Sequence, residues 1–128
     1  MKKILIEISF GELLDKLSIL EIKREKITRN DSLKLIEKEY KILEKIYKET
    51  LGIEKFEKFY KELKKINLKL WDIENEKRGC EKEKNFGEKF IKLSRDVHFM
   101  NDKRAMVKLN INKISGSNIE EVKEYTKY

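Results

Sequence analysis

The chain has 128 residues, of which 43% are charged and 39% hydrophobic, and its formal net charge is +7. A chain of this length buries a core as one domain, which we place at residues 1–128, and its single cysteine excludes an internal disulfide. No run approaches the roughly 20 apolar residues of a membrane span, and the apolar start is too short for a signal peptide. We therefore expect a cytoplasmic protein.

Basic and acidic residues interleave along the chain, as residues 61–65 illustrate. This mixture is typical of solvated helix faces on which Glu and Lys lie one turn apart. Only five of the 31 basic residues are arginine. Because lysine also serves as a general solubilising residue, the basic excess is weak evidence for nucleic-acid binding, and we expect no nucleic-acid partner.

Residues 4–10 are mostly apolar and rich in isoleucine, which predicts a short β-strand or an extended arm. A single strand leaves its backbone N–H and C=O groups unpaired. We therefore expect this segment to need a partner strand, which a second copy of the chain could supply.

Two helices are expected next. Ser9 and Glu12 fit a capping box, in which each side chain bonds the other residue's backbone, so the first helix starts there. Residues 30–32 end this helix and cap the next one. The second helix is expected over residues 33–50, with Gly52 as its stop signal.

Two longer helices and a tail complete the predicted fold. The third helix ends at Gly79 or continues to residue 83, and residues 85–87 turn the chain. Gly116 stands where a C-cap glycine belongs, so the fourth helix ends just before it. Residues 117–120 fit another capping box and open a short tail. Short turns favour an all-α fold, an antiparallel four-helix bundle.

Two arginines take positions of the apolar helix stripes where a hydrophobic side chain is expected. In the last helix Arg104 interrupts an apolar stripe, and in the first helix Arg24 does the same. A buried guanidinium costs several kcal/mol unless polar groups satisfy it. Counting residues from each turn places both arginines at one level of the bundle. The residues expected in this layer are Arg24, Glu37, Asn67, Arg104, Glu21 and Asn101.

This expected layer has two interpretations. A buried ion-pair layer would fix the register of the helices at some cost in stability. Two guanidinium groups facing one cavity would instead bind a carboxylate or phosphate in bidentate fashion, which lysine cannot do. The first interpretation suits a non-enzymatic interaction or regulatory module. The second suits a binder of a small anionic metabolite, or an enzyme acting on one.

The two later helices are expected to be longer than the first two, so their tips should project beyond the bundle. The apolar residues that these tips would expose are too many to stay in water, and a second copy of the chain should cover them. We therefore expect a homodimer. The residues predicted to form its interface are Ile73, Phe86, Phe90 and Leu93.

The remaining candidates for chemistry are few. His98 is the only histidine, and Cys80 has no histidine near it in the sequence. There is no Glu-x-x-His motif and no glycine-rich phosphate loop. We therefore predict no metal ion and no cofactor, and we name no catalytic residue. Trp71 neighbours the stripe residue Leu70, so it is expected to pack in the core, with stacking on a ligand as the alternative.

Four runs of sequence, taken as a set, resemble a family of small bacterial proteins of uncharacterised function. They are residues 10–20 (FGELLDKLSIL), 70–74 (LWDIE) and 101–105 (NDKRA), and Gly116-Ser117 followed by Tyr125. The likeness covers nearly the whole chain and implies a single-domain protein without transferring any catalytic residue.

A weaker likeness is to the all-helical chorismate mutases. Residues 12–17 have the rhythm of the first helix of those enzymes, which hold a dicarboxylate between arginines inside a helical dimer. By analogy, Arg24 and Arg104 would take that part here.

Overall fold

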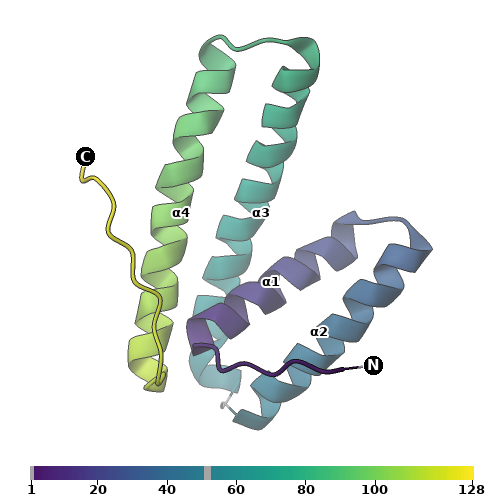
Figure 1. Cartoon of the computed structure of the whole chain (residues 1–128), viewed down its shortest axis with the longest axis vertical. Coiled ribbons are helices and arrows are strands. Elements are labelled where there is room, and N and C mark those ends of the chain that lie inside the picture. Colours follow the sequence, from purple (N-terminus) through teal and green to yellow (C-terminus); the bar gives the residue numbers. More distant parts are fainter. Residues whose placement is uncertain (1, 51–52) are drawn as a thin grey trace.

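The computed structural model describes residues 2–50 and 53–128, and these residues form four α-helices in two hairpins (Figure 1). The hairpin of the first two helices lies across the lower half of the longer second hairpin. The first helix contacts each of the other three, and the last two pack on each other. The helices are α1 (Phe10–Lys26), α2 (Asn30–Thr50), α3 (Ile53–Glu83) and α4 (Glu88–Ser115).

The predicted all-α class is confirmed, but the N-terminal segment is not a strand. Residues 2–8 form an extended arm ahead of Ser9, the N-cap of α1, and no β-strand is present among the residues that the structure describes. A lone strand leaves its backbone N–H and C=O groups unpaired, and the described part of the chain offers this segment no second strand. The helices are antiparallel within each hairpin, whereas the two hairpins cross (Figure 1).

The caps explain where the helices begin and end. The Ser9 side chain accepts a hydrogen bond from the backbone N of Glu12 at 3.2 Å, as predicted. Gly116 follows α4 in the left-handed conformation, with φ of 69°, also as predicted. The helix α2 begins at Asn30 rather than residue 33, because the backbone N of Leu33 already bonds the carbonyl of Arg29 at 2.9 Å. Gly52, the predicted stop, lies outside the described residues.

The tail does not begin with a helical turn, so the capping box predicted at residues 117–120 is wrong. From residue 117 onward the chain runs back alongside α4 without regular structure (Figure 1). The Ser117 side chain instead accepts a hydrogen bond from the backbone N of Phe10 at 3.0 Å. Ser117, which was predicted to belong to that capping box, therefore supplies the acceptor for the first backbone N–H of α1.

The core lies where α1 crosses α3 and α4. Leu14 on α1, Leu63 on α3 and Ile111 on α4 are each 0% exposed. The helix α2 covers one side of α1 and adds Tyr47 to the core. The helix α1 is therefore surrounded on several faces, and its polar side chains meet the protein interior as well as solvent.

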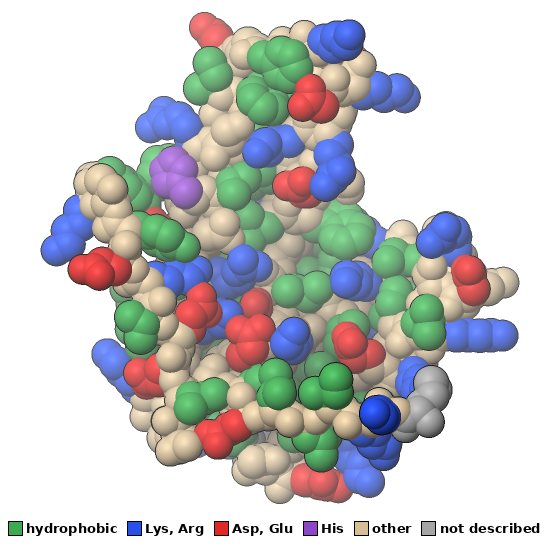
Figure 2. Space-filling model, in the orientation of Figure 1, with side chains coloured by type: hydrophobic (Ala, Val, Ile, Leu, Met, Phe, Trp, Pro, Cys, Tyr) green, Lys and Arg blue, Asp and Glu red, His purple; other side chains and the backbone are tan. Residues whose placement is uncertain are grey.

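The surface is mixed in charge. On the face drawn in Figure 2, Lys and Arg side chains alternate with Asp and Glu side chains. Over the described residues, no helix combines the length and the apolar character that crossing a membrane requires.

The start of α1 approaches α4 at Gly11. Its backbone N donates a hydrogen bond to Asn112 Oδ1 at 2.7 Å. A Cβ atom at Gly11 would lie only 2.7 Å from the carbonyl oxygen of Lys108, which belongs to a helix backbone and cannot move aside easily. Glycine is therefore required here for close packing, and not for an unusual backbone conformation.

We expect Gly11→Ala to destabilise the protein by about 1–3 kcal/mol, because the added methyl group overpacks the α1–α4 contact. The matched control is Gly79→Ala on α3, where nothing lies within 4 Å of the added Cβ. There the change should stabilise by about 0.5–1 kcal/mol through helix propensity. Urea unfolding measures both; equal effects of the two substitutions would contradict the packing argument.

Candidate functional site

A connected set of polar side chains crosses the contact between α1, α3 and α4. Each member bonds at least one other member, and the set links the three helices. We call this set the polar layer. It consists of Asp15, Ser18, Asn67, Asn101, Arg104 and Lys108.

Asp15 is the buried acid of the polar layer, with only 5% of its surface exposed. Its Oδ1 accepts a hydrogen bond from Asn67 Nδ2 at 2.8 Å, and its Oδ2 lies 3.5 Å from Lys108 Nζ. A buried carboxylate is tolerated only when it is paired and hydrogen-bonded. One residue of α1 therefore requires partners from both α3 and α4.

Asn67 joins the two ends of the polar layer and is also 5% exposed. Its Nδ2 donates to Asp15 Oδ1 and to Ser18 Oγ, both at 2.8 Å, and its Oδ1 accepts from Arg104 Nη1 at 3.0 Å. The Ser18 hydroxyl in turn donates to the backbone carbonyl of Asp15 at 2.8 Å. Among the described residues, no buried side-chain N or O atom lacks a partner.

Arg104 is half-buried at the edge of the polar layer. Its Nη1 donates to Asn67 and its Nη2 donates to Asn101 Oδ1 at 2.7 Å. Both acceptors are neutral amides, and within residues 2–50 and 53–128 the guanidinium forms no ion pair. Its positive charge is therefore positioned by its partners without being neutralised by them.

Arg104 lines a pocket of about 300 Å³ between α1, α3 and α4. Most of its walls are apolar or aromatic, and its polar groups are amides, one guanidinium and one carboxylate. That carboxylate, Glu74, already pairs with Arg78 at 3.2 Å. The pocket is lined by Ile19, Ile22, Asn67, Leu70, Trp71, Glu74, Val97, Asn101 and Arg104.

Lys108 lies one turn after Arg104 on α4, and its side chain is 12% exposed. Besides Asp15, its Nζ contacts Glu12 Oε2 at 2.8 Å and Glu121 Oε2 at 3.1 Å. Burial by itself lowers the pKa of this ammonium, but these carboxylates outweigh burial and hold the pKa above its usual value. Lys108 is therefore charged and ties both α1 and the tail to α4.

Arg24, the other predicted arginine, lies apart from the polar layer. Its Nε pairs with Glu37 Oε2 at 2.9 Å, and its guanidinium lies 4.3 Å from the centre of the Tyr40 ring. Both partners are on α2, and 37% of the Arg24 side chain is exposed. The prediction that Arg24 and Arg104 lie at one level assumed four aligned helices. The crossing of the hairpins instead carries the end of α1 away from α4 (Figure 1).

Glu21, also predicted in the layer, belongs to a third group between α1 and α3. It accepts hydrogen bonds from the Tyr60 hydroxyl and from Lys64 Nζ, the latter at 2.9 Å. Burial raises the pKa of the Glu21 carboxyl, but the bonds from Tyr60 and Lys64 outweigh it and hold the pKa below its usual value. The six predicted residues thus fall into three groups, of which only Asn67, Asn101 and Arg104 share the polar layer.

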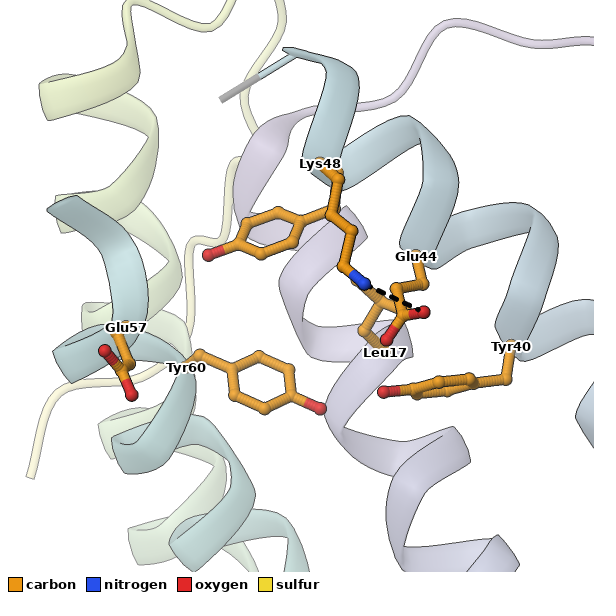
Figure 3. Close-up of a pocket in the computed structure, with 7 residues that line it drawn as sticks. Leu17, Tyr40, Glu44, Lys48, Glu57 and Tyr60 are labelled. Atoms are coloured by element: carbon orange, nitrogen blue, oxygen red, sulfur yellow. Dashed lines mark ion pairs between the residues drawn. The ribbon is translucent and has the colours of Figure 1, made fainter. Parts of the chain in front are cut away.

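Sequence reasoning missed a second pocket, of about 250 Å³, between α1, α2 and α3 (Figure 3). The hydroxyl groups of Tyr40 and Tyr60 point toward each other across it, and Lys48 pairs with Glu44 at 3.4 Å. Burial and the bond to Glu44 raise the pKa of Tyr40 to about 12, so its phenol is neutral. Because its acids already have lysine partners, this pocket is less suited to an ionic ligand than the pocket at Arg104.

Sequence reasoning also missed the two members of the polar layer on α1. Gly11, Leu14, Asp15, Ser18 and Ile22 are all buried and recur in steps of three and four, which is a second inward stripe. That spacing was visible in the sequence. The signal was hidden because Asp15 stands among other charged residues that face solvent.

The absence of a bound metal ion stays a prediction. In the parts of the chain that the structure describes, no three His, Cys, Asp or Glu side chains are grouped as metal ligands would be.

The residues predicted to form a dimer interface divide into two kinds. Ile73 and Leu93 are 5% and 7% exposed and already packed within the α3–α4 hairpin. Phe86 is 50% exposed and stacks edge-to-face with Phe90 near the tip. The pairing of two copies through this tip stays a prediction, which now depends on Phe86 and Phe90.

Removing the amide of Asn67 should destabilise the fold. We expect Asn67→Ala to cost about 1–3 kcal/mol, because Asp15 and Arg104 would each lose a buried partner. Asn75→Ala, on an exposed position of the same helix, is the control and should change stability by less than about 0.5 kcal/mol. A similar small effect of both substitutions in chemical denaturation would show that the polar layer is not required for stability.

Glu21 should make stability depend on pH in the acid range. Because its pKa is lowered in the folded state, its contribution is present above the unfolded pKa and is lost as pH falls through the folded value. Between about pH 6 and pH 3, the free energy of unfolding should therefore fall less steeply in Glu21→Gln than in the unmodified protein. Glu39→Gln, on the exposed side of α2, is the control and should leave the slope unchanged.

Comparison with known proteins identifies a family whose function is unknown. No curated protein and no solved structure matches the chain. Residues 3–128 match the model of a family of unknown function, DUF6165. The resemblance to a family of uncharacterised function is confirmed to that extent, whereas the bacterial origin and the analogy to chorismate mutases stay predictions. Because the match spans nearly its whole length, the chain belongs to the DUF6165 family.

Proposed function

We propose that the protein is a non-enzymatic binding module that holds a small organic anion, a carboxylate or a phosphate ester, at Arg104. The observation that supports this proposal most directly is the position of the Arg104 guanidinium and the nature of its hydrogen-bond partners. It lines a pocket, and its partners among the described residues are two neutral amide oxygens. A positive charge that is oriented but not neutralised is suited to an anionic partner.

The two amides leave part of the guanidinium available. A guanidinium has five N–H donors, and the bonds to Asn67 and Asn101 engage one on Nη1 and one on Nη2. The remaining donors suit a carboxylate or phosphate group. Because the two asparagines fix the plane of the group, little side-chain entropy remains to be lost on binding.

The other walls of the pocket favour an organic ligand over an inorganic ion. Trp71 lies on α3 and lines the pocket with Leu70, while Val97 lines it from α4. Small-molecule sites typically combine apolar walls with a few polar groups that fix orientation. A ligand with one anionic group and an apolar or planar body would use both the guanidinium and the indole.

The acids and the hydroxyl in or next to this pocket all have partners, which supports binding rather than catalysis. Glu74, the carboxylate that lines it, pairs with Arg78. Both oxygens of Asp15 are engaged, by Asn67 and by Lys108. The Ser18 hydroxyl accepts from Asn67 and donates to a backbone carbonyl. Because these groups bond one another, they stabilise the fold and hold the arginine in place.

Titration of the protein with anions tests this proposal. Trp71 is the only tryptophan, so its fluorescence reports directly on the pocket. We expect citrate, benzoate or a sugar phosphate to change this emission and to raise the melting temperature. A ligand present at 100 times its Kd stabilises the native state by about 2.7 kcal/mol.

The variant Arg104→Met should lose the response to anions while keeping the helical circular dichroism. Arg24→Met is the matched control, because it removes an arginine from a different site and should respond like the unmodified protein. An unchanged response in Arg104→Met, or no response to any anion in the unmodified protein, would refute the proposal. The second result would leave Arg104 as part of a register-fixing layer.

A further inference from the structure

The N-terminal arm, residues 2–8, is the most exposed apolar segment of the structure. Ile4, Leu5 and Ile6 are 87%, 89% and 77% exposed, and in the view of Figure 1 the arm runs from the start of α1 across α2. At its base, Ile8 packs against the core and Glu7 Oε2 accepts a hydrogen bond from Asn118 Nδ2 at 2.7 Å. The arm is thus anchored at one end and without apolar cover at the other.

The backbone of the arm is also free to pair. Among the residues that the structure describes, no backbone hydrogen bond joins residues 3–8 to another segment. An extended apolar segment with open N–H and C=O groups is a template for another strand. The side chains of the arm determine which strand can pair with it.

The sequence of the arm is complementary to itself. When two copies run antiparallel with Leu5 opposite Leu5, Lys3 of each copy faces Glu7 of the other, and Ile4 faces Ile6. Twofold symmetry repeats each of these pairs. Opposite charges placed directly across from each other stabilise a strand pair, and like charges would destabilise it.

The same register separates the two faces of the ribbon. Side chains alternate along a strand, so Lys3, Leu5 and Glu7 share one face. The other face carries Ile4, Ile6 and Ile8 from both copies. Shifting the pairing by one residue would place Lys3 opposite Ile6 and mix the two faces, which makes it the poorer alternative.

We propose that the N-terminal arms of two copies pair as an antiparallel ribbon, with Leu5 on the twofold axis and two Lys3–Glu7 ion pairs beside it. The partner of the arm is therefore a second copy of this chain. A two-stranded ribbon of this length buries less surface than a standard interface of about 800 Å² per partner, so the dimer depends on concentration. This inference is independent of the anion site at Arg104.

Charge reversal tests the pairing. Sedimentation velocity over about 10 µM to 1 mM should show the unmodified protein passing from monomer to dimer. Lys3→Glu should weaken this dimer about tenfold or more, because a glutamate then faces Glu7 in both pairs. Glu7→Lys should weaken it similarly, since two lysines then face each other. An equimolar mixture of these two variants should dimerise again, because every position opposite a glutamate then holds a lysine.

Two controls separate this interface from the alternatives. Lys2→Glu makes the same change in charge, but residue 2 faces Ile8 in the proposed register, so the dimer should persist. Phe86→Ser removes an aromatic side chain from the interface predicted at the tip of the α3–α4 hairpin, and it should also leave the dimer intact. Far-UV circular dichroism verifies that each variant keeps its helices.

Three results would overturn the proposal. The first is an unmodified protein that stays monomeric at the highest concentration. The second is a mixture of Lys3→Glu and Glu7→Lys that fails to dimerise although the unmodified protein does. The third is loss of the dimer in Phe86→Ser together with unaltered arm variants, which would place the interface at the tip.

Discussion

The burial of the Asp15 carboxylate is the constraint on which the arrangement of the helices depends. An unpaired charge at that depth would cost several kcal/mol, so α1 is stable only where Asp15 reaches both Asn67 on α3 and Lys108 on α4. Apolar packing alone allows a helix to slide or rotate on a hairpin with small losses. The close approach at Gly11 and the paired acid together select one crossing, which explains why α1 lies across the second hairpin.

The orientation of Arg104 follows from this constraint through Asn67. Because both protons of the Asn67 amide nitrogen are engaged, by Asp15 and by Ser18, its oxygen must turn toward α4. The arginine donates to that oxygen, and Asn101 holds the second nitrogen of the guanidinium. A buried acid on α1 thus fixes the direction of a cation on α4 without touching it.

Local rules predicted the parts of the fold that depend on local chemistry. The cap at Ser9, the left-handed Gly116 and the positions of the helices were all readable from the sequence. The grouping of polar residues was readable only in part. Asn67, Asn101 and Arg104 belong together, but Arg24 does not join them, because the angle between the hairpins depends on packing across the whole molecule. Asp15 escaped notice because a buried acid and a solvated one look the same in a charged sequence.

The two interpretations of the polar layer are compatible, since different residues carry them. Asp15 and Lys108 form the paired charges that fix register, whereas the hydrogen-bond partners of Arg104 among the described residues are two neutral amides, and Arg104 lines a pocket. A ligand anion in this pocket would lie beside Asn67 and Arg104, which both line it, whereas Asp15 and Lys108 do not line it. Binding would therefore leave the register-fixing pair intact. The paired charges of Asp15 and Lys108 fix the position of α1 on α4, and through Asn67 this contact orients a guanidinium that forms no ion pair among the described residues.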